Sequence, residues 1–161
     1  MEDNDERLQR ALEVGHGYLN RRDRTEAEMR RRFASGGIDE ATADQAVGVL
    51  AQQGMLDDIR YARLFTQDKR ELEQWGNDRI RRTLLERGID RELVEQTLRA
   101  EPAESEAEFD RALALLRRRF SGPPRDRRER DRALGVMLRK GYDSELALDV
   151  LAAYSRVGNG P

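Results

Sequence analysis

Apolar residues recur every three or four positions along most of this chain, which is the spacing of one face of an α-helix. In the stretch 6–22, for example, Leu8, Leu12 and Leu19 share a face. Val, Ile and Thr are scarce beside Ala, Leu, Arg and Glu, and this balance favours helix over sheet. The pattern therefore predicts an all-α protein built from nine helices.

A short motif of glycine, an apolar residue and aspartate recurs at separations of 51 and 53 residues. Its copies are Gly37-Ile38-Asp39, Gly88-Ile89-Asp90 and Gly141-Tyr142-Asp143. Glycine can adopt the left-handed conformation that ends a helix, and aspartate can accept hydrogen bonds from the free amides that begin the next one. Each motif therefore predicts a corner between two helices, and the period predicts three groups of three helices.

The period also predicts the domain organisation. We expect three-helix repeats at 5–54, 55–101 and 102–157, followed by a flexible tail at 158–161. Units of about 50 residues bury little surface alone, so we expect the repeats to stack in a row. Such stacks expose long side faces that usually bind other macromolecules.

Several residues carry the signature of a helix start. Thr25 with Glu28, and Ser105 with Glu108, fit the capping box, in which a hydroxyl and a carboxylate bind each other's backbone amides. Asn77, after a helix-breaking glycine, is a candidate cap as well.

The few aromatic residues lie mostly on the apolar faces and are expected in the core. Trp75 is the exception. It stands beside Gly76, and a turn position can leave its ring half exposed.

The sequence offers little for catalysis. It contains no Cys, its one histidine is His16, and it has no glycine-rich phosphate loop. Asp57 and Asp58 resemble a magnesium pair, but adjacent helical residues point about 100° apart. Asp57 as a helix cap, with Asp58 in the first turn, explains both carboxylates. We therefore predict no enzyme, no metal, no cofactor and no small-molecule substrate.

The location of the protein can also be predicted. The first ten residues are acidic, unlike a signal peptide, and no stretch approaches the ~18 apolar residues of a membrane span. The sequence thus predicts a cytoplasmic protein with no membrane partner.

Charge is balanced in total but not along the chain. The 161 residues include 30 basic and 32 acidic side chains, and the net charge is -2. Residues 111–140 hold 11 basic and 3 acidic residues, whereas 101–110 hold 5 acidic and no basic ones. Of the 30 basic residues 28 are Arg, whose planar guanidinium suits phosphate and carboxylate.

The densest basic run is a candidate phosphate contact. It comprises Arg117, Arg118, Arg119, Arg125, Arg127 and Arg128. The alternative is that Asp126, Glu129 and Asp131 pair with these arginines along a solvated helix.

Three motifs resemble the bacterial RecX regulatory proteins. They are the runs 54–62 (GMLDDIRYA), 75–80 (WGNDRI) and 84–89 (LLERGI), and residues 20–28 and 139–142 add to the likeness, which covers about 10–154. Departures are Met55, where the family commonly has Leu, Gln74, where a basic residue often stands, and the proline-containing joint 121–124.

The resemblance implies a curved rod of tandem three-helix repeats that binds the RecA nucleoprotein filament. It implies a protein that lies in the filament groove and restrains strand exchange, ATP turnover and repressor cleavage. The partners are then the RecA filament and the single-stranded DNA within it, with weak binding to bare DNA.

Candidate contact residues follow from the matched motifs. They are Arg21, Arg22, Arg24, Arg60, Arg79 and Arg82, to which charge alone adds the run from Arg117 to Arg128. Arg60 has an alternative role, because a salt bridge to Asp57 would tie the repeat boundary. Asp57, Tyr61 and Gly76 are assigned to structure.

Two rival functions remain open. The chain could be a nonspecific nucleic-acid-binding module whose corners act as helix-turn-helix units, or a protein-only scaffold. A filament regulator should bind RecA-coated strands far more tightly than either component. A nucleic-acid module should bind bare DNA equally well, and a scaffold should ignore it.

Overall fold

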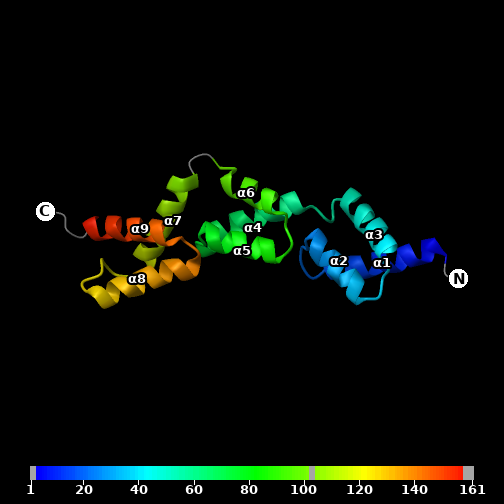
Figure 1. Cartoon of the computed structure of the whole chain (residues 1–161), viewed down its shortest axis with the longest axis horizontal. Helices are drawn as coiled ribbons and strands as arrows, with labels where there is room; N and C mark the ends of the chain where they lie inside the picture. Colours follow the sequence, from blue (N-terminus) through cyan, green and yellow to red (C-terminus); the bar gives the residue numbers. More distant parts are fainter. Residues whose placement is uncertain (1–2, 102–103, 158–161) are drawn as a thin grey trace. The chain divides into compact units, whose positions relative to one another are not determined.

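The computed structural model describes residues 3–101 and 104–157, and these residues form nine α-helices and no strand (Figure 1). The helices are α1 Asn4–Leu19, α2 Glu26–Ser35, α3 Glu40–Gln52, α4 Asp58–Glu73, α5 Asn77–Glu86, α6 Arg91–Arg99, α7 Glu104–Arg119, α8 Arg127–Lys140 and α9 Ser144–Val157. The predicted all-α class and its nine helices in tandem triplets are confirmed. We call α1–α3, α4–α6 and α7–α9 the first, second and third triplets.

Helix α2 begins as its sequence predicts. The hydroxyl of Thr25 accepts a hydrogen bond from the amide of Glu28 at 3.1 Å, and the amide of Thr25 donates to the Glu28 carboxylate at 3.2 Å. The predicted capping box is therefore present. It satisfies two amides that the first helical turn leaves without partners.

The helices predicted at Asn77 and Ser105 are present, but these two residues do not cap them. Helix α7 begins at Glu104, so Ser105 lies inside its first turn, and the Glu108 carboxylate accepts a hydrogen bond from the amide of Asn77. Asn77 is itself the first residue of α5, and its side-chain amide donates to Glu108 at 3.2 Å. The sequence pattern was misleading because the side chains of Asn77 and Glu108 bind each other across two helices instead of capping their own.

The described residues divide into two compact units. The first unit runs to Leu64 and adds Leu84–Val94, and the second takes Phe65–Thr83 and continues from Glu95. Each unit thus combines one terminal triplet with part of the second triplet.

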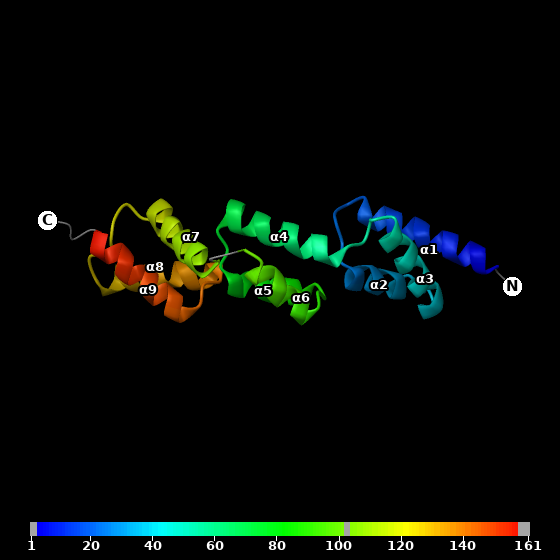
Figure 2. The ribbon, with the colours of Figure 1, turned by 90° about the horizontal axis from the view of Figure 1, so that it is seen from above.

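In the first unit, α1 packs against both α2 and α3 (Figure 2). Their facing apolar residues form a core around Met29, Phe33 and Leu50, which are fully buried. Gly15 of α1 lets the backbone approach that core, because a methyl group added there would lie 3.0 Å from the Leu50 side chain.

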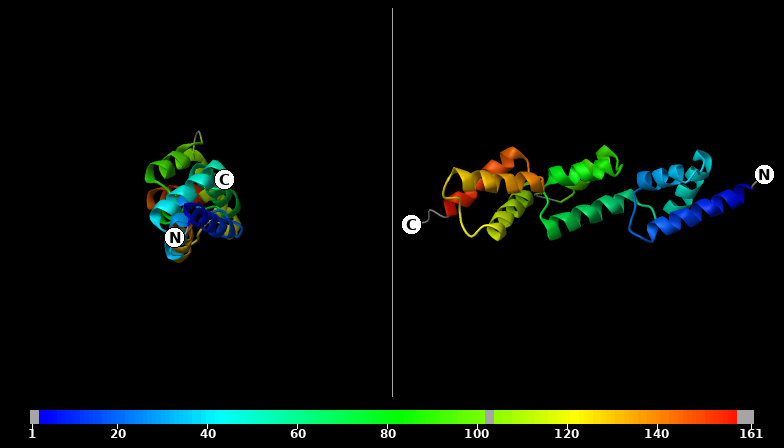
Figure 3. Two further views of the ribbon diagram at one scale, coloured as in Figure 1. Left: turned by 90° about the vertical axis from the view of Figure 1, so that its right-hand side faces the viewer. Right: turned by 90° about the horizontal axis from the view of Figure 1, so that it is seen from below.

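In the second unit, α7, α8 and α9 pack against one another (Figure 3). Leu116, Met137 and Leu151 are buried at the centre, and Phe120 packs against the edge of this core from the end of α7. No helix in the described part of the chain is long and apolar enough to cross a membrane.

Trp75 corrects one expectation, because its side chain is only 7% exposed. Phe65 packs edge-on against its ring, with 6.1 Å between ring centroids. The guanidinium of Arg79 lies 3.9 Å from the ring centroid, and the Lys69 ammonium lies 4.7 Å away. The ring at this turn is therefore covered by cations from α4 and α5.

Candidate functional site

The three glycine corners share one conformation but differ in what surrounds them. Gly37, Gly88 and Gly141 have φ angles of 76°, 84° and 101°. A methyl group added at Gly37 would meet no atom within 4 Å, whereas one at Gly88 would overlap the Cβ of Ala27. At Gly141 it would overlap Arg79. The second and third corners thus each press against the second helix of the preceding triplet.

Aspartates cap the helices that follow the corners. Asp39 accepts a hydrogen bond from the amide of Thr42 at 3.0 Å, and Asp143 accepts one from Leu146 at 2.9 Å. Asp90 accepts from Glu92 at 3.1 Å.

We use the term repeat joint for the contact between the N-terminus of one triplet's second helix and the following triplet. In the first unit, the Thr25 hydroxyl donates to the carbonyl of Arg87 at 2.6 Å, beside the Gly88 corner. The amide of Glu26 donates to the Asp58 carboxylate at 2.9 Å. The joint thus supplies acceptors to the start of α2. Asp57, by contrast, caps α4 by accepting from the amide of Arg60 at 3.0 Å.

Side chains around Tyr61 complete this joint. Arg22 donates to the Glu28 carboxylate at 2.6 Å and to the Tyr61 hydroxyl at 3.5 Å. Arg87 donates to the same hydroxyl. Tyr61 is therefore a buried acceptor shared by two arginines of the joint.

The second unit contains a second repeat joint with different chemistry. The amide of Gly76 donates to the carbonyl of Lys140, and the amide of Asp78 donates to that of Gly141, both at 2.9 Å. Glu108 accepts from the amide of Asn77 at 3.0 Å. A methyl group on Gly76 would overlap the Gly141 backbone, so glycine is required there by close approach.

A buried ionic network lies beside this second joint. Arg70 donates to Glu104 at 3.0 Å, to the side chain of Asn77 at 2.9 Å and to the carbonyl of Leu98 at 3.1 Å. Arg111 donates to the same Glu104 at 2.8 Å. Burial lowers the pKa of Arg70. Sequence reasoning missed this network, because nothing in a helical pattern distinguishes a buried arginine from a solvated one.

Burial also affects the two carboxylates that reach across the joints. It raises the pKa of Asp58 and of Glu108 above the ordinary values of 3.8 and 4.5, although each accepts a backbone hydrogen bond that opposes the shift.

Besides Arg22, three of the arginines predicted as contacts are held by the protein itself. The guanidinium of Arg24 lies 3.8 Å from the Tyr18 ring centroid, and its side chain is 10% exposed. Arg60 donates to the carbonyl of Gly54 at 2.7 Å rather than pairing with Asp57. Arg79 covers Trp75 and donates to the carbonyl of Arg139 at 3.4 Å.

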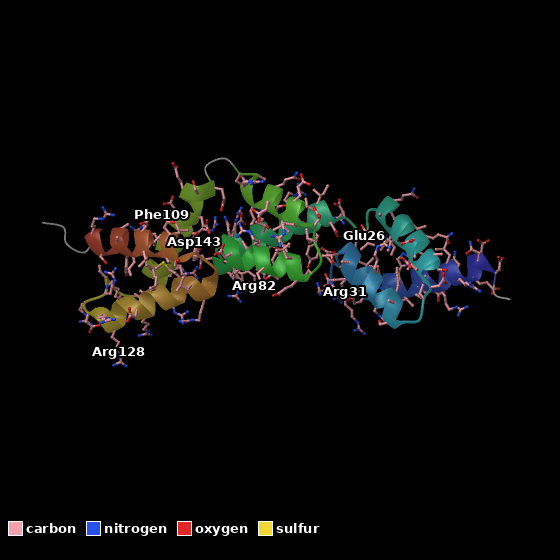
Figure 4. All side chains as sticks on the ribbon, viewed as in Figure 1. Glu26, Arg31, Arg82, Phe109, Arg128 and Asp143 are labelled. Atoms are coloured by element: carbon pink, nitrogen blue, oxygen red, sulfur yellow. The ribbon has the colours of Figure 1, made fainter. Side chains whose placement is uncertain are left out.

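Seven predicted contact arginines are instead exposed. No hydrogen bond or ion pair joins their side chains to another residue in the described part of the chain. They are Arg21, Arg82, Arg117, Arg118, Arg119, Arg127 and Arg128. Figure 4 shows Arg82 on α5 and Arg128 on α8 pointing away from their helices. Arg125 is also exposed and pairs with Glu129 at 3.1 Å.

Sequence models of the RecX family match the chain three times in order. The first, second and third three-helix domains of RecX match residues 11–50, 57–98 and 106–151. Regulatory protein RecX of Trichlorobacter lovleyi is 35% identical over 131 residues, which cover 80% of this chain and 84% of that protein. The chain belongs to the RecX family. The resemblance stated from the sequence motifs is confirmed.

Further comparisons agree with this membership. Regulatory protein RecX of Thermus thermophilus is 32% identical over 150 residues, 93% of this chain and 96% of that protein. The crystal structure of RecX from Lactobacillus salivarius has the same fold, with a TM-score of 0.79 at 18% identity over 94% of this chain and 99% of that one. The family is one of regulatory proteins and not of enzymes.

The charged residues at the two ends of α7 have different surroundings. Glu104 and Glu108, from its acidic first half, are engaged in the second repeat joint. Its last turn carries Arg117, Arg118 and Arg119, all exposed. Glu104 and Glu108 thus bind within the protein, whereas the three arginines of the last turn face solvent.

Proposed function

We propose that this chain binds the RecA nucleoprotein filament in the cytoplasm and restrains its recombinase and coprotease activities. The observation that carries the proposal is the match of all three RecX domains in order along the chain. The repeats at 5–54, 55–101 and 102–157 act as linked modules, whose weak contacts add through avidity.

The basic surface at the α7–α8 connection contacts phosphates of the strand within the filament. We define the basic surface as Arg117, Arg118, Arg119, Arg125, Arg127 and Arg128, and its exposure supports this role. Among the described residues, only Arg125 of this surface forms an ion pair with a nearby acid, because Glu129 binds Arg125 and Asp126 caps α8 at 2.8 Å. Guanidinium groups bind phosphate in bidentate geometry and release counterions from the polymer.

The arginines held by internal contacts serve the fold first. Arg24, Arg60 and Arg79 bond to a ring or a carbonyl of the chain, so their replacement would act through stability. Arg21 and Arg82, which are exposed, extend the filament contact beyond the basic surface.

Charge reversal tests the proposal. The triple variant R117E/R118E/R119E should bind cognate RecA filaments on single-stranded DNA at least tenfold more weakly, in a fluorescence anisotropy titration, and inhibit strand exchange correspondingly less. The matched control is R63E/R91E/R99E, which reverses three exposed arginines and changes the net charge equally. Equal losses in both variants would remove the basic surface from the contact.

The wild type decides between the filament and its components. We expect far tighter binding to the RecA filament than to bare single-stranded DNA or to RecA alone. Equal affinity for bare DNA, with a salt slope of about -0.7 per phosphate contact, would establish the nonspecific nucleic-acid module instead. Binding to neither would refute both functions.

A further inference from the structure

The second unit contains a pocket of about 770 Å³ beside the basic surface. It is formed by the connection between α7 and α8 together with one side of α8 and of α9. Its lining includes Phe120, Pro123, Pro124, Arg125, Arg132 and Tyr154. The volume lies within the range of ~300–1,000 Å³ that is typical of small-molecule sites.

The pocket combines an aromatic ring with cations. Phe120 is only partly buried, and the guanidinium of Arg132 lies 5.6 Å from its ring centroid. The Arg125 side chain is 87% exposed at the rim. The one acid in the lining, Glu129, already accepts from the amide of Arg125 at 2.7 Å and pairs with its guanidinium. The lining therefore keeps a net positive charge around an apolar ring.

The position of the pocket also separates the third triplet from the others. Pro124, Arg125 and Glu129 flank Asp126, which caps α8. The corresponding starts of α2 and α5 are covered by the corner of the next triplet. The start of α8 borders the pocket instead.

We infer that the pocket holds one nucleotide of a single-stranded nucleic acid. The base lies against the Phe120 ring, and Arg125 and Arg132 bind the adjacent phosphates. Stacking on an aromatic ring within a basic groove is how single strands are bound without sequence preference. An acidic protein segment would match the cations but would leave the ring without a function. The inference rests on the proposed function and names the contact that the basic surface makes with the strand.

The test uses the full chain and a single-stranded oligonucleotide carrying 2-aminopurine, whose fluorescence falls when the base stacks. F120L keeps an apolar side chain against the core but removes the aromatic face. We expect F120L to abolish most of the quenching and to weaken binding about tenfold. R132Q should weaken binding and make its salt dependence shallower by about 0.7 in slope, the share of one phosphate contact.

Matched variants separate binding from folding. F109L replaces another partly buried phenylalanine of the same core, and R91Q replaces an exposed arginine outside the basic surface. Both should bind and quench as the wild type does. Urea unfolding of F120L and F109L checks that the two variants lose similar stability.

The outcomes are distinct. If F120L retains the wild-type quenching, or binds as tightly as F109L, the pocket is not a nucleotide site. Filament binding by the wild type would be unaffected by that result. Displacement of the oligonucleotide by poly-glutamate at equal charge concentration would show an acidic-segment site instead. Failure of the wild type to bind filaments, measured separately, would refute the proposed function.

Discussion

The two units build the same joint from different chemistry. In the first unit, side chains form the joint. The Thr25 hydroxyl donates to the Arg87 carbonyl, and a partly exposed Arg22 donates to the Glu28 carboxylate. In the second unit, the backbone amides of Gly76 and Asp78 donate to the carbonyls of Lys140 and Gly141. A glycine corner at positive φ is common to both.

One side-chain contact is also repeated. Asp58 and Glu108 lie 50 residues apart, and each accepts a hydrogen bond from the first amide of the preceding triplet's second helix. The comparison teaches that a repeat joint needs two features. A glycine permits the corner to approach the preceding triplet closely, and a carboxylate accepts from a first-turn amide that has no partner within its own helix. The remaining contacts vary.

The largest effect should come from the glycine corners. G88A and G141A add a methyl group where Ala27 and Arg79 already lie, and they impose a left-handed backbone on an L-residue. We expect each to lose about 2–4 kcal/mol of unfolding free energy, against about 1 kcal/mol for G37A, where space is open. Urea denaturation measures all three.

A double variant isolates the close approach. A27G removes the atom that the new methyl group of G88A would meet. A27G/G88A should therefore be more stable than the sum of its single changes predicts. Strict additivity, or equal losses at the three corners, would contradict the assigned packing.

The buried network should give the next largest effect. R70M removes a cation that is 9% exposed and has three acceptors, so we expect a loss of about 2–3 kcal/mol, with Arg111 still paired to Glu104. R22M, at a site 45% exposed in the first joint, should cost less than about 1 kcal/mol. Thermal and urea unfolding test this ranking, which a larger loss in R22M would reverse.

The sequence predicted the helices and corners because their signals are local. A glycine at positive φ followed by a capping aspartate lies within three residues, and its repetition defines the triplets. The joints pair residues far apart in the chain, such as Thr25 with Arg87 and Arg70 with Glu104. No local pattern specifies those partners.

The arginines show the same limit. Arg24 precedes α2 and Arg117 lies in the last turn of α7, and the sequence gives both the same charge and polarity, yet one stacks on Tyr18 and the other is exposed. Which arginine finds an aromatic ring or a free carbonyl depends on how helices pack. Charge density alone therefore predicted the region of the basic surface but not the role of each residue.

Backbone strain gives a smaller contrast between the units. Gln74 has a φ of 52°, and no other non-glycine residue in the described ranges has a positive φ. Q74G should gain up to about 1 kcal/mol of stability, since glycine adopts this conformation without steric cost. Its counterpart 51 residues earlier, Asp23, does not have a positive φ, so D23G should lose stability. Urea midpoints of the two variants should move in opposite directions, and a shared direction would contradict the strain.

The smallest effect should be a dependence on pH shared by both joints. Burial raises the pKa of Asp58 and of Glu108, so each folded carboxyl binds a proton more tightly than it does in the unfolded chain. Its stabilising contribution is therefore full below its ordinary pKa and is lost as the pH rises through the raised value. Relative to D58N and E108Q, the wild type should gain stability as the pH falls from 7 toward 3.8 and 4.5 respectively. Urea titrations across this range measure the difference, with D149N as a control on the exposed side of α9. A relative gain toward neutral pH would mean that the joint hydrogen bonds, and not burial, dominate these two carboxyls.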